Sequence, residues 1–187
     1  HAEKKMSIKK NSKLFIDYAY KYRDDFLDFF LMSKAHLYVS TSGGLDHLAF
    51  AFNKPMIISA PCIWDFFVEN KNIIFMLKRF FNTKTKKNLN IKNIFKDFFK
   101  DKNNFFHTKD NFFKKKNIQI KENTPQEWKK IISNFNTLRR NNFKIKDKYK
   151  KKSDRFWNLF IENNSTATKD YYQKNKIKSF YSWSNFR

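Results

Sequence analysis

Hydroxyl residues and glycines stand together in the segment STSGGLD, which holds both glycines of the 187-residue chain. A phosphate binds well where backbone N–H groups at a helix start point outward and no side chain blocks its approach. Gly43 and Gly44 remove side chains from this segment. Hydroxyl donors are added by Ser40, Thr41 and Ser42. The pattern therefore suits a phosphate-binding turn, and an ordinary strand-to-helix turn explains it equally well.

Other chemistry is less well supported by the spacing. The turn is neither G-x-G-x-x-G nor a Gly-Lys-Ser/Thr P-loop, so it does not indicate NAD binding or ATP hydrolysis. Asp46 could cap the following helix or hold a sugar hydroxyl, and His47 could face the same site. The four histidines show no metal-ligand spacing, and the single cysteine, Cys62, excludes a cysteine-built zinc site. We expect no metal and no cofactor.

The elements that must position the turn follow the order strand, helix, strand, turn, helix, strand. Hydrophobic periodicity predicts strands at 13–19, 36–40 and 54–61, and helices at 23–35 and 45–53. Crossovers of this length give right-handed units of two parallel strands and a helix. We therefore expect an α/β fold with a Rossmann-like parallel sheet flanked by helices. The turn would lie beyond the carboxyl ends of the strands, where such sheets bind ligands.

Residues 62–120 contain repeated phenylalanine pairs separated by lysine and asparagine. We interpret this segment as a Phe/Lys-rich helical insert whose phenylalanines pack on the domain. The alternative is a basic, amphipathic element at 95–116 that contacts an anionic membrane.

A capping box marks the clearest helix start in the chain. Thr124 is the expected N-cap, Pro125 takes the first helical position, and Glu127 follows three residues after the cap. The apolar stripe of this helix comprises Trp128, Ile131, Ile132 and Phe135. We divide the chain into a frayed end or cut loop at 1–12, a nucleotide-sugar-binding domain at 13–140, and a basic linker with a helical and aromatic tail at 141–187.

The net charge of +23 admits two explanations. It could serve a polyanionic partner, which could be nucleic acid, an anionic membrane surface or a phosphorylated substrate. It could also follow from AT-rich codons, which would raise lysine, asparagine, phenylalanine and isoleucine together while glycine stays scarce. A hydrophobic content of 41% supports a sizeable core, and no apolar run approaches the ~18 residues of a membrane span.

The flanks of the turn resemble a known family. Four features carry the likeness: Asp17-Tyr18, Asp25-Phe26-Leu27-Asp28, the loop from Thr41 to Leu45, and the Phe52–Pro55 stretch. With the later ENTPQEW start at 122–128, they resemble the C-terminal half of bacterial GT-B glycosyltransferases of O-antigen and capsule clusters. The likeness covers roughly residues 13–61 and 121–138. Gly44 departs from the family, which commonly has a variable residue there or none.

The resemblance implies a glycosyltransferase that binds a nucleotide-sugar donor for surface-polysaccharide synthesis. The donor diphosphate would meet Ser40, Thr41, Ser42, Gly43, Gly44 and Leu45. Weaker contacts to the donor sugar or nucleoside would come from Asp17, Asp46 and His47. We expect a fragment that lacks the acceptor-binding half, with a glycan or lipid-linked acceptor and a cytoplasmic location, peripheral at the inner membrane. The alternative is a non-catalytic module that binds nucleic acid or an anionic membrane, although no specific nucleic acid is expected.

Overall fold

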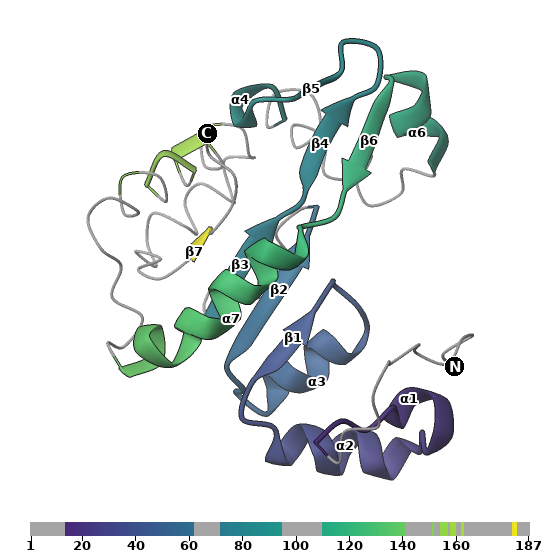
Figure 1. Cartoon of the computed structure of the whole chain (residues 1–187), viewed down its shortest axis with the longest axis vertical. Coiled ribbons are helices and arrows are strands. Elements are labelled where there is room, and N and C mark those ends of the chain that lie inside the picture. The colour runs from purple at the N-terminus through teal and green to yellow at the C-terminus, as the bar shows by residue number, and fades with distance from the viewer. Residues whose placement is uncertain are drawn as a thin grey trace.

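The computed structural model describes residues 14–61, 72–94 and 110–140, with positions 151, 154–156, 158–159, 162 and 181–182 of the C-terminal part. Figure 1 shows the elements in chain order: α1 (Tyr18–Lys21), α2 (Asp25–Lys34), β1 (Tyr38–Ser40), α3 (Leu45–Ala51), β2 (Met56–Ala60), β3 (Ile73–Leu77), β4 (Arg79–Asn82), β5 (Lys87–Asn88), α4 (Ile91–Ile94), α6 (Asp110–Lys115), β6 (Ile118–Lys121), α7 (Pro125–Arg140) and β7 (Tyr181–Ser182).

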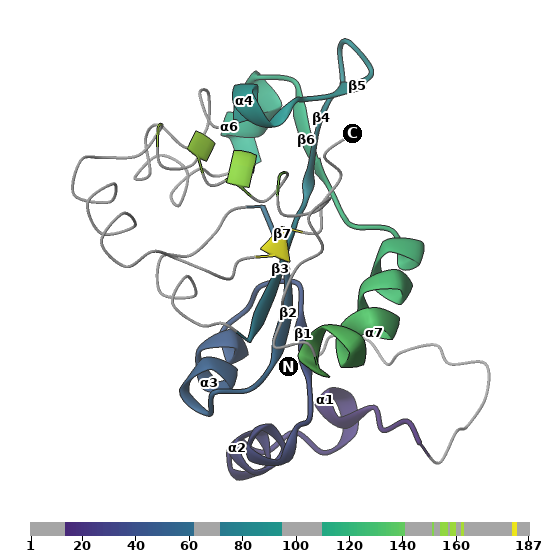
Figure 2. The ribbon, with the colours of Figure 1, turned by 90° about the vertical axis from the view of Figure 1, so that its left-hand side faces the viewer.

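A parallel sheet forms the centre of the fold. Its strand order is β1-β2-β3-β7, and every neighbouring pair is parallel. All residues of β2 and β3 are buried, as expected for strands that are covered on both faces. Figure 2 shows α3 and α7 on opposite sides of this sheet. The predicted α/β architecture, a parallel sheet flanked by helices, is therefore confirmed in this coarse form.

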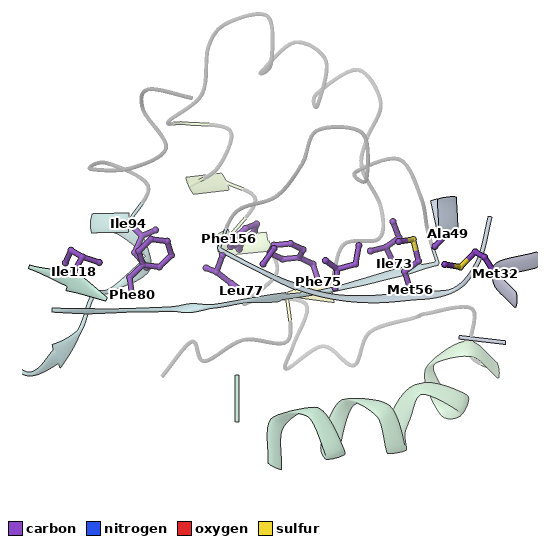
Figure 3. Close-up of a cluster of buried hydrophobic side chains, with 12 residues drawn as sticks. Met32, Ala49, Met56, Ile73, Phe75, Leu77, Phe80, Ile94, Ile118 and Phe156 are labelled. Atoms are coloured by element: carbon purple, nitrogen blue, oxygen red, sulfur yellow. The ribbon is translucent and has the colours of Figure 1, made fainter. Parts of the chain in front are cut away.

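Two apolar clusters cover the two faces of the parallel sheet. Successive strand residues point to opposite faces, so Met56 and Ile58 join one cluster while Ile57 joins the other. The larger cluster also contains Phe75 and extends along the sheet to Ile118 (Figure 3). The smaller cluster lies under α7 and comprises Ile57, Ile74, Met76, Ile131 and Phe135.

The helix α7 begins at the predicted capping box. Thr124 N donates to Glu127 Oε2 over 2.7 Å, and Glu127 N donates to Thr124 Oγ1 over 3.2 Å. Three of the four predicted stripe residues face the sheet: Ile131 and Phe135 are buried, and Trp128 packs against them. Ile132 is instead 42% exposed, because it lies on the flank of the stripe. The interaction of Thr124 with Glu127 fixes the point at which the chain leaves β6 and enters α7.

The prediction of a helical insert at 62–120 is wrong for much of its described part. That part contains β3, the third strand of the parallel sheet, and an antiparallel sheet of order β5-β4-β6. Phe80 and Phe81 are a strand pair: Phe80 enters the core, whereas Phe81 lies under the ammonium of Lys121, 3.4 Å from its ring centre. A short apolar run such as 73–77 fits a buried strand or a buried helix, and periodicity alone does not separate them. Within the described residues of 62–120, the helices are α4 and α6.

The prediction of a strand at 13–19 is also wrong. Residues 18–21 form α1, and Leu14 is 98% exposed. Among the described residues, no strand lies beside this segment, so its backbone has no strand to form a sheet with. Instead, Tyr18 Oη donates to Asp24 O over 2.8 Å and accepts from Asp24 N over 3.1 Å, which attaches α1 to the start of α2.

The C-terminal part contributes to the same core where it is described. Phe156 is buried in the larger cluster, and Leu159 packs against that cluster, so these two residues dock on the domain. The two residues of β7 pair with Ile74 and Phe75 of β3. The predictions for residues 1–12 and for the phenylalanine pairs at 66–67, 98–99 and 105–106 concern positions outside the described residues.

Candidate ligand-binding edge of the parallel sheet

The predicted phosphate turn lies at the carboxyl edge of the sheet. The loop 41–44 follows β1 and leads into α3, as predicted. Ser42 N donates to Ser40 Oγ over 3.0 Å, and Asp46 N donates to Gly43 O over 3.0 Å. Thr41, Gly43 and Gly44 are exposed. The loop is therefore held by short-range bonds while its outer surface stays open.

Asp46 is buried and fixes the loop from inside. Its Oδ1 accepts from the hydroxyl of Tyr38, and its Oδ2 accepts from Gly43 N, each over 3.0 Å. Burial raises the pKa of Tyr38 to about 12. A hydrogen bond with Ser40 lowers this pKa, and the nearby charge of Asp46 raises it further. Both oxygens of this carboxylate have protein partners, so Asp46 is a structural residue of the loop in this conformation.

Neither the packing nor the backbone conformation of the loop requires glycine at positions 43 and 44. A Cβ added to Gly43 or Gly44 would meet nothing within 4 Å, and neither residue has a positive φ. The left-handed conformation, which favours glycine, is instead adopted by Ser42, Asn53, Lys86 and Asn117, with φ between 49° and 78°. What the paired glycines provide is open space above the loop backbone.

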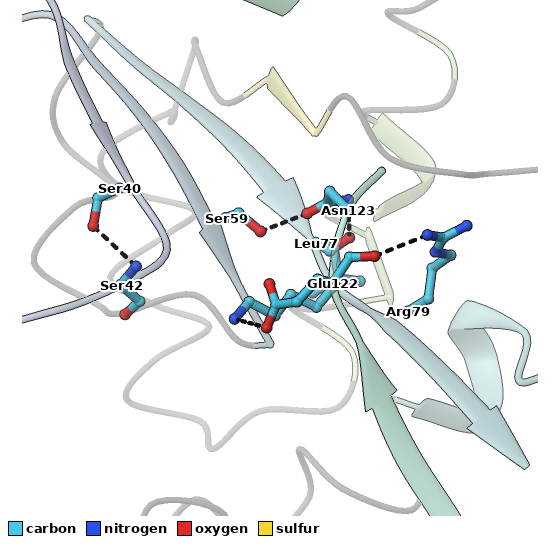
Figure 4. Close-up of polar contacts among 8 residues, drawn as sticks. Ser40, Ser42, Ser59, Leu77, Arg79, Glu122 and Asn123 are labelled. Carbon is cyan, nitrogen blue, oxygen red and sulfur yellow. Dashed lines mark hydrogen bonds and ion pairs between the residues drawn. The ribbon is translucent and has the colours of Figure 1, made fainter. Parts of the chain in front are cut away.

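A buried amide joins the ends of the two central strands to the start of α7. The hydroxyl of Ser59, in β2, donates to Asn123 Oδ1 over 2.5 Å. Asn123 Nδ2 lies 3.4 Å from Leu77 O, at the end of β3 (Figure 4). Because buried polar groups must be paired, these two contacts explain why an amide stands at position 123.

Two cations follow directly after β3. Lys78 Nζ lies 2.7 Å from Glu122 Oε1, and Arg79 Nη2 donates to Glu122 O over 2.8 Å (Figure 4). Arg79 Nη2 also lies 3.9 Å from Glu127 Oε2. The Nε of Arg79 is buried, and the described residues offer it no hydrogen-bond partner. This part of the carboxyl edge therefore holds two cations and two carboxylates in close contact.

The structure brings together most of the predicted site residues. Ser40 to Leu45 run from the last residue of β1 through the loop 41–44 to the first residue of α3, and His47 is an exposed residue of α3. Asp17 lies elsewhere, as the N-cap of α1 beside α2, at the amino end of the parallel strands (Figure 1). The sequence-based site did not include Ser59, Lys78, Arg79, Glu122 or Asn123. A signal for the cations was present, because a lysine and an arginine end the apolar run at 73–77.

Other kinds of site are not evident in the described part of the chain. It holds no group of three or more His, Cys, Asp or Glu side chains that could bind a metal ion. Among the described helices, none is long and apolar enough to cross a membrane. A pocket of about 560 Å³ lies between α6 and β6, lined by Phe113, Lys114, Asn117 and residues 118–120 among others. This pocket belongs to the antiparallel sheet rather than to the loop 41–44.

Comparison with known proteins adds no relative: no family model matches the chain, and neither a curated protein nor a solved structure matches it.

Proposed function

We propose that the chain binds a nucleotide-sugar donor at the carboxyl edge of its parallel sheet and takes part in glycosyl transfer for surface-polysaccharide synthesis. The observation that carries this proposal is the exposed loop 41–44. It follows a parallel strand and contains two glycines. Neither the backbone angles nor the packing at these two positions requires glycine, so their effect is to leave open space above the loop. Ligands of open α/β sheets bind at this edge. The sequence resemblance to GT-B glycosyltransferases supports the choice of ligand.

The proposed chemistry is stabilisation of the diphosphate that leaves when the sugar is transferred. Hydrogen-bond donors fixed in advance at the position of a developing charge lower the barrier of such a step. The loop hydroxyls of Thr41 and Ser42 would supply donors, and Asp46 would act indirectly, by holding the loop through Gly43. We assign no catalytic base, and the acceptor is proposed to be a glycan or a lipid-linked sugar.

Ligand-observed NMR with UDP, GDP, CMP and their sugars tests this proposal. Gly43→Val should abolish binding, because the new side chain fills the space above the loop. The fold should survive, since a Cβ at this position meets no neighbouring atom. Ala51→Val, an exposed position at the other end of α3, adds the same kind of bulk away from the loop and should bind normally. Binding of no nucleotide, or equal binding by both variants, would remove the donor site.

A second candidate, non-specific binding of nucleic acid, is favoured by the net charge of +23. Binding through charge alone weakens steeply with salt and shows no base preference. A salt titration of oligonucleotide binding separates it from a specific nucleotide site.

Contact with an anionic membrane is the other proposed partner, assigned to residues 95–116. It would bring a cytoplasmic enzyme to a lipid-linked acceptor at the inner membrane. Vesicle sedimentation of the chain with and without 95–116 tests it, and unchanged binding to anionic vesicles after the deletion would dismiss it.

A further inference from the structure

Lys78 and the glycine loop follow two strands, β3 and β1, that lie on either side of β2. The register aligns Ser40 of β1 with Ile58 of β2 and Phe75 of β3. The glycine loop begins directly after Ser40, and Lys78 directly follows the last residue of β3. Lys78 N donates to Ala60 O over 2.9 Å, so the chain remains beside β2 up to this point. Two strand spacings correspond to about 10 Å, which is the separation of β1 and β3 across β2.

The ion pair between Lys78 and Glu122 is asymmetric. The side chain of Lys78 is only 11% exposed, whereas that of Glu122 is 64% exposed. A lysine side chain that is largely covered requires an anion or several hydrogen-bond acceptors near it. An exposed carboxylate, in contrast, loses little when it returns to water. Another anion can therefore replace the Glu122 carboxylate at low cost in free energy, while Lys78 keeps its position.

Arg79 adds unused hydrogen-bonding capacity beside the same carboxylate. Its guanidinium donates to Glu122 O, and its Nε has no partner in the described residues. Glu127, 3.9 Å away, already accepts from Thr124 N in the capping box. Lys78 and Arg79 together thus offer more donors than the acidic groups around them use.

We propose that Lys78 and Arg79 form the anion-binding part of this edge, and that the Glu122 carboxylate occupies the place of a ligand phosphate until the ligand displaces it. The identity of that ligand as a donor diphosphate rests on the proposed function. The displacement itself does not, because it follows from the geometry of the ion pair and holds for any diphosphate. Glu122 thereby acts as an internal competitor that weakens the binding of anions to the empty protein.

Calorimetric titration with inorganic pyrophosphate, at fixed ionic strength, tests the displacement. Glu122→Gln removes the competitor and should tighten binding about two- to fivefold, the range expected for an exposed ion pair. Asp25→Asn changes the net charge equally at an exposed position that has no ion pair in the described residues, and should change binding less than twofold. Thermal unfolding of each variant verifies that it is folded.

The loss of the cation gives the opposite result. Lys78→Gln should weaken pyrophosphate binding about tenfold or more, because a charge-assisted hydrogen bond is lost. Lys84→Gln, in the exposed turn between β4 and β5, removes the same charge and should have little effect. If Lys78→Gln does not fold, Lys78→Arg keeps the charge and should retain binding within a few-fold, while Glu122→Gln alone still tests the competition.

The outcomes separate this inference from the proposed function. Pyrophosphate that does not bind, or variants that behave as their charge-matched controls do, overturn the inference. If nucleotide sugars bind in a way that depends on Gly43, but Glu122→Gln and Lys78→Gln have no specific effect, the donor site is supported and the displacement is overturned. Pyrophosphate binding with the expected pattern, but no nucleotide binding, keeps the anion site and overturns the donor assignment.

Discussion

The hydroxyl of Tyr38 donates to Asp46 Oδ1 over 3.0 Å, and the other oxygen of that carboxylate holds Gly43 N over the same distance. These bonds connect the first residue of β1 to the first turn of α3 and close the loop between them. The shape of the glycine loop is therefore determined from beneath, by a buried acid, and not by the glycines themselves.

Replacing Tyr38 with phenylalanine should destabilise the protein by about 1–3 kcal/mol, because Asp46 Oδ1 would remain buried without this donor. Chemical denaturation near pH 7 measures the difference. The same variant should also weaken ligand binding through a less ordered loop. An unchanged free energy of unfolding would show that the bond contributes nothing.

The contribution of Tyr38 should depend on pH in the alkaline range. Its pKa is raised to about 12 in the folded protein, above its ordinary value of 10.0, so the folded state holds the proton more tightly. The resulting stabilisation is complete below pH 10 and disappears as the pH rises towards 12. The gap in unfolding free energy between the natural chain and Tyr38→Phe should therefore shrink between pH 10 and pH 12. A constant gap would contradict the raised pKa.

Two adjacent isoleucines of α7 should respond differently to truncation. Ile131 is fully buried between α7 and the sheet, so Ile131→Ala should cost about 2–5 kcal/mol. Ile132 is 42% exposed, and Ile132→Ala should cost less than about 1 kcal/mol. Urea denaturation of both variants measures the contrast. Equal losses would mean that α7 does not pack on the sheet through the face described.

The capping box should be worth about 1 kcal/mol, because Thr124→Ala removes the side-chain bond to Glu127 N. Thr137→Ala, an exposed interior position of the same helix, is the matched control. It should be neutral or slightly stabilising, since alanine is the better helix former. Thermal unfolding of the two variants decides whether the cap or the helix propensity dominates.

Lys86 should be a site of easy stabilisation. It has a φ of 55° in the exposed turn between β4 and β5, where a side chain costs about 1–2 kcal/mol. Lys86→Gly should therefore raise the unfolding free energy by up to about 1 kcal/mol, after the added freedom of the unfolded chain is subtracted. Lys84→Gly, in the same turn without a positive φ, should lower it. The reverse order in calorimetry would contradict this turn conformation.

Local signals predicted the elements around the loop well. The glycine turn after β1 and the capping box of α7 each act within a few residues, and the structure contains both. The loop was predicted for the same reason. The parallel direction of the strands at 36–40 and 54–61 was predicted from the length of the crossover between them.

The errors arose where tertiary partners decide. Residues 13–19 have the composition of a strand, but α2 provides the partner for Tyr18 and no strand lies beside them in the described residues. The apolar run at 73–77 became a strand because β2 pairs with it along its whole length. The role of Asp46 was also open, because its choice between a ligand and Tyr38 depends on contacts across eight residues. The same applies to Lys78 and Glu122, which meet only in the folded chain.

The most direct test of the donor site is a titration of the isotope-labelled protein with nucleotide sugars, followed through its backbone amide signals. We expect saturable shifts confined to the carboxyl edge, at Thr41, Gly43, Gly44 and Lys78, for one nucleotide in preference to the others. Gly43→Val should remove these shifts without altering the rest of the spectrum. Shifts spread over exposed lysines and lost at moderate salt, or no shifts at the loop, would contradict it.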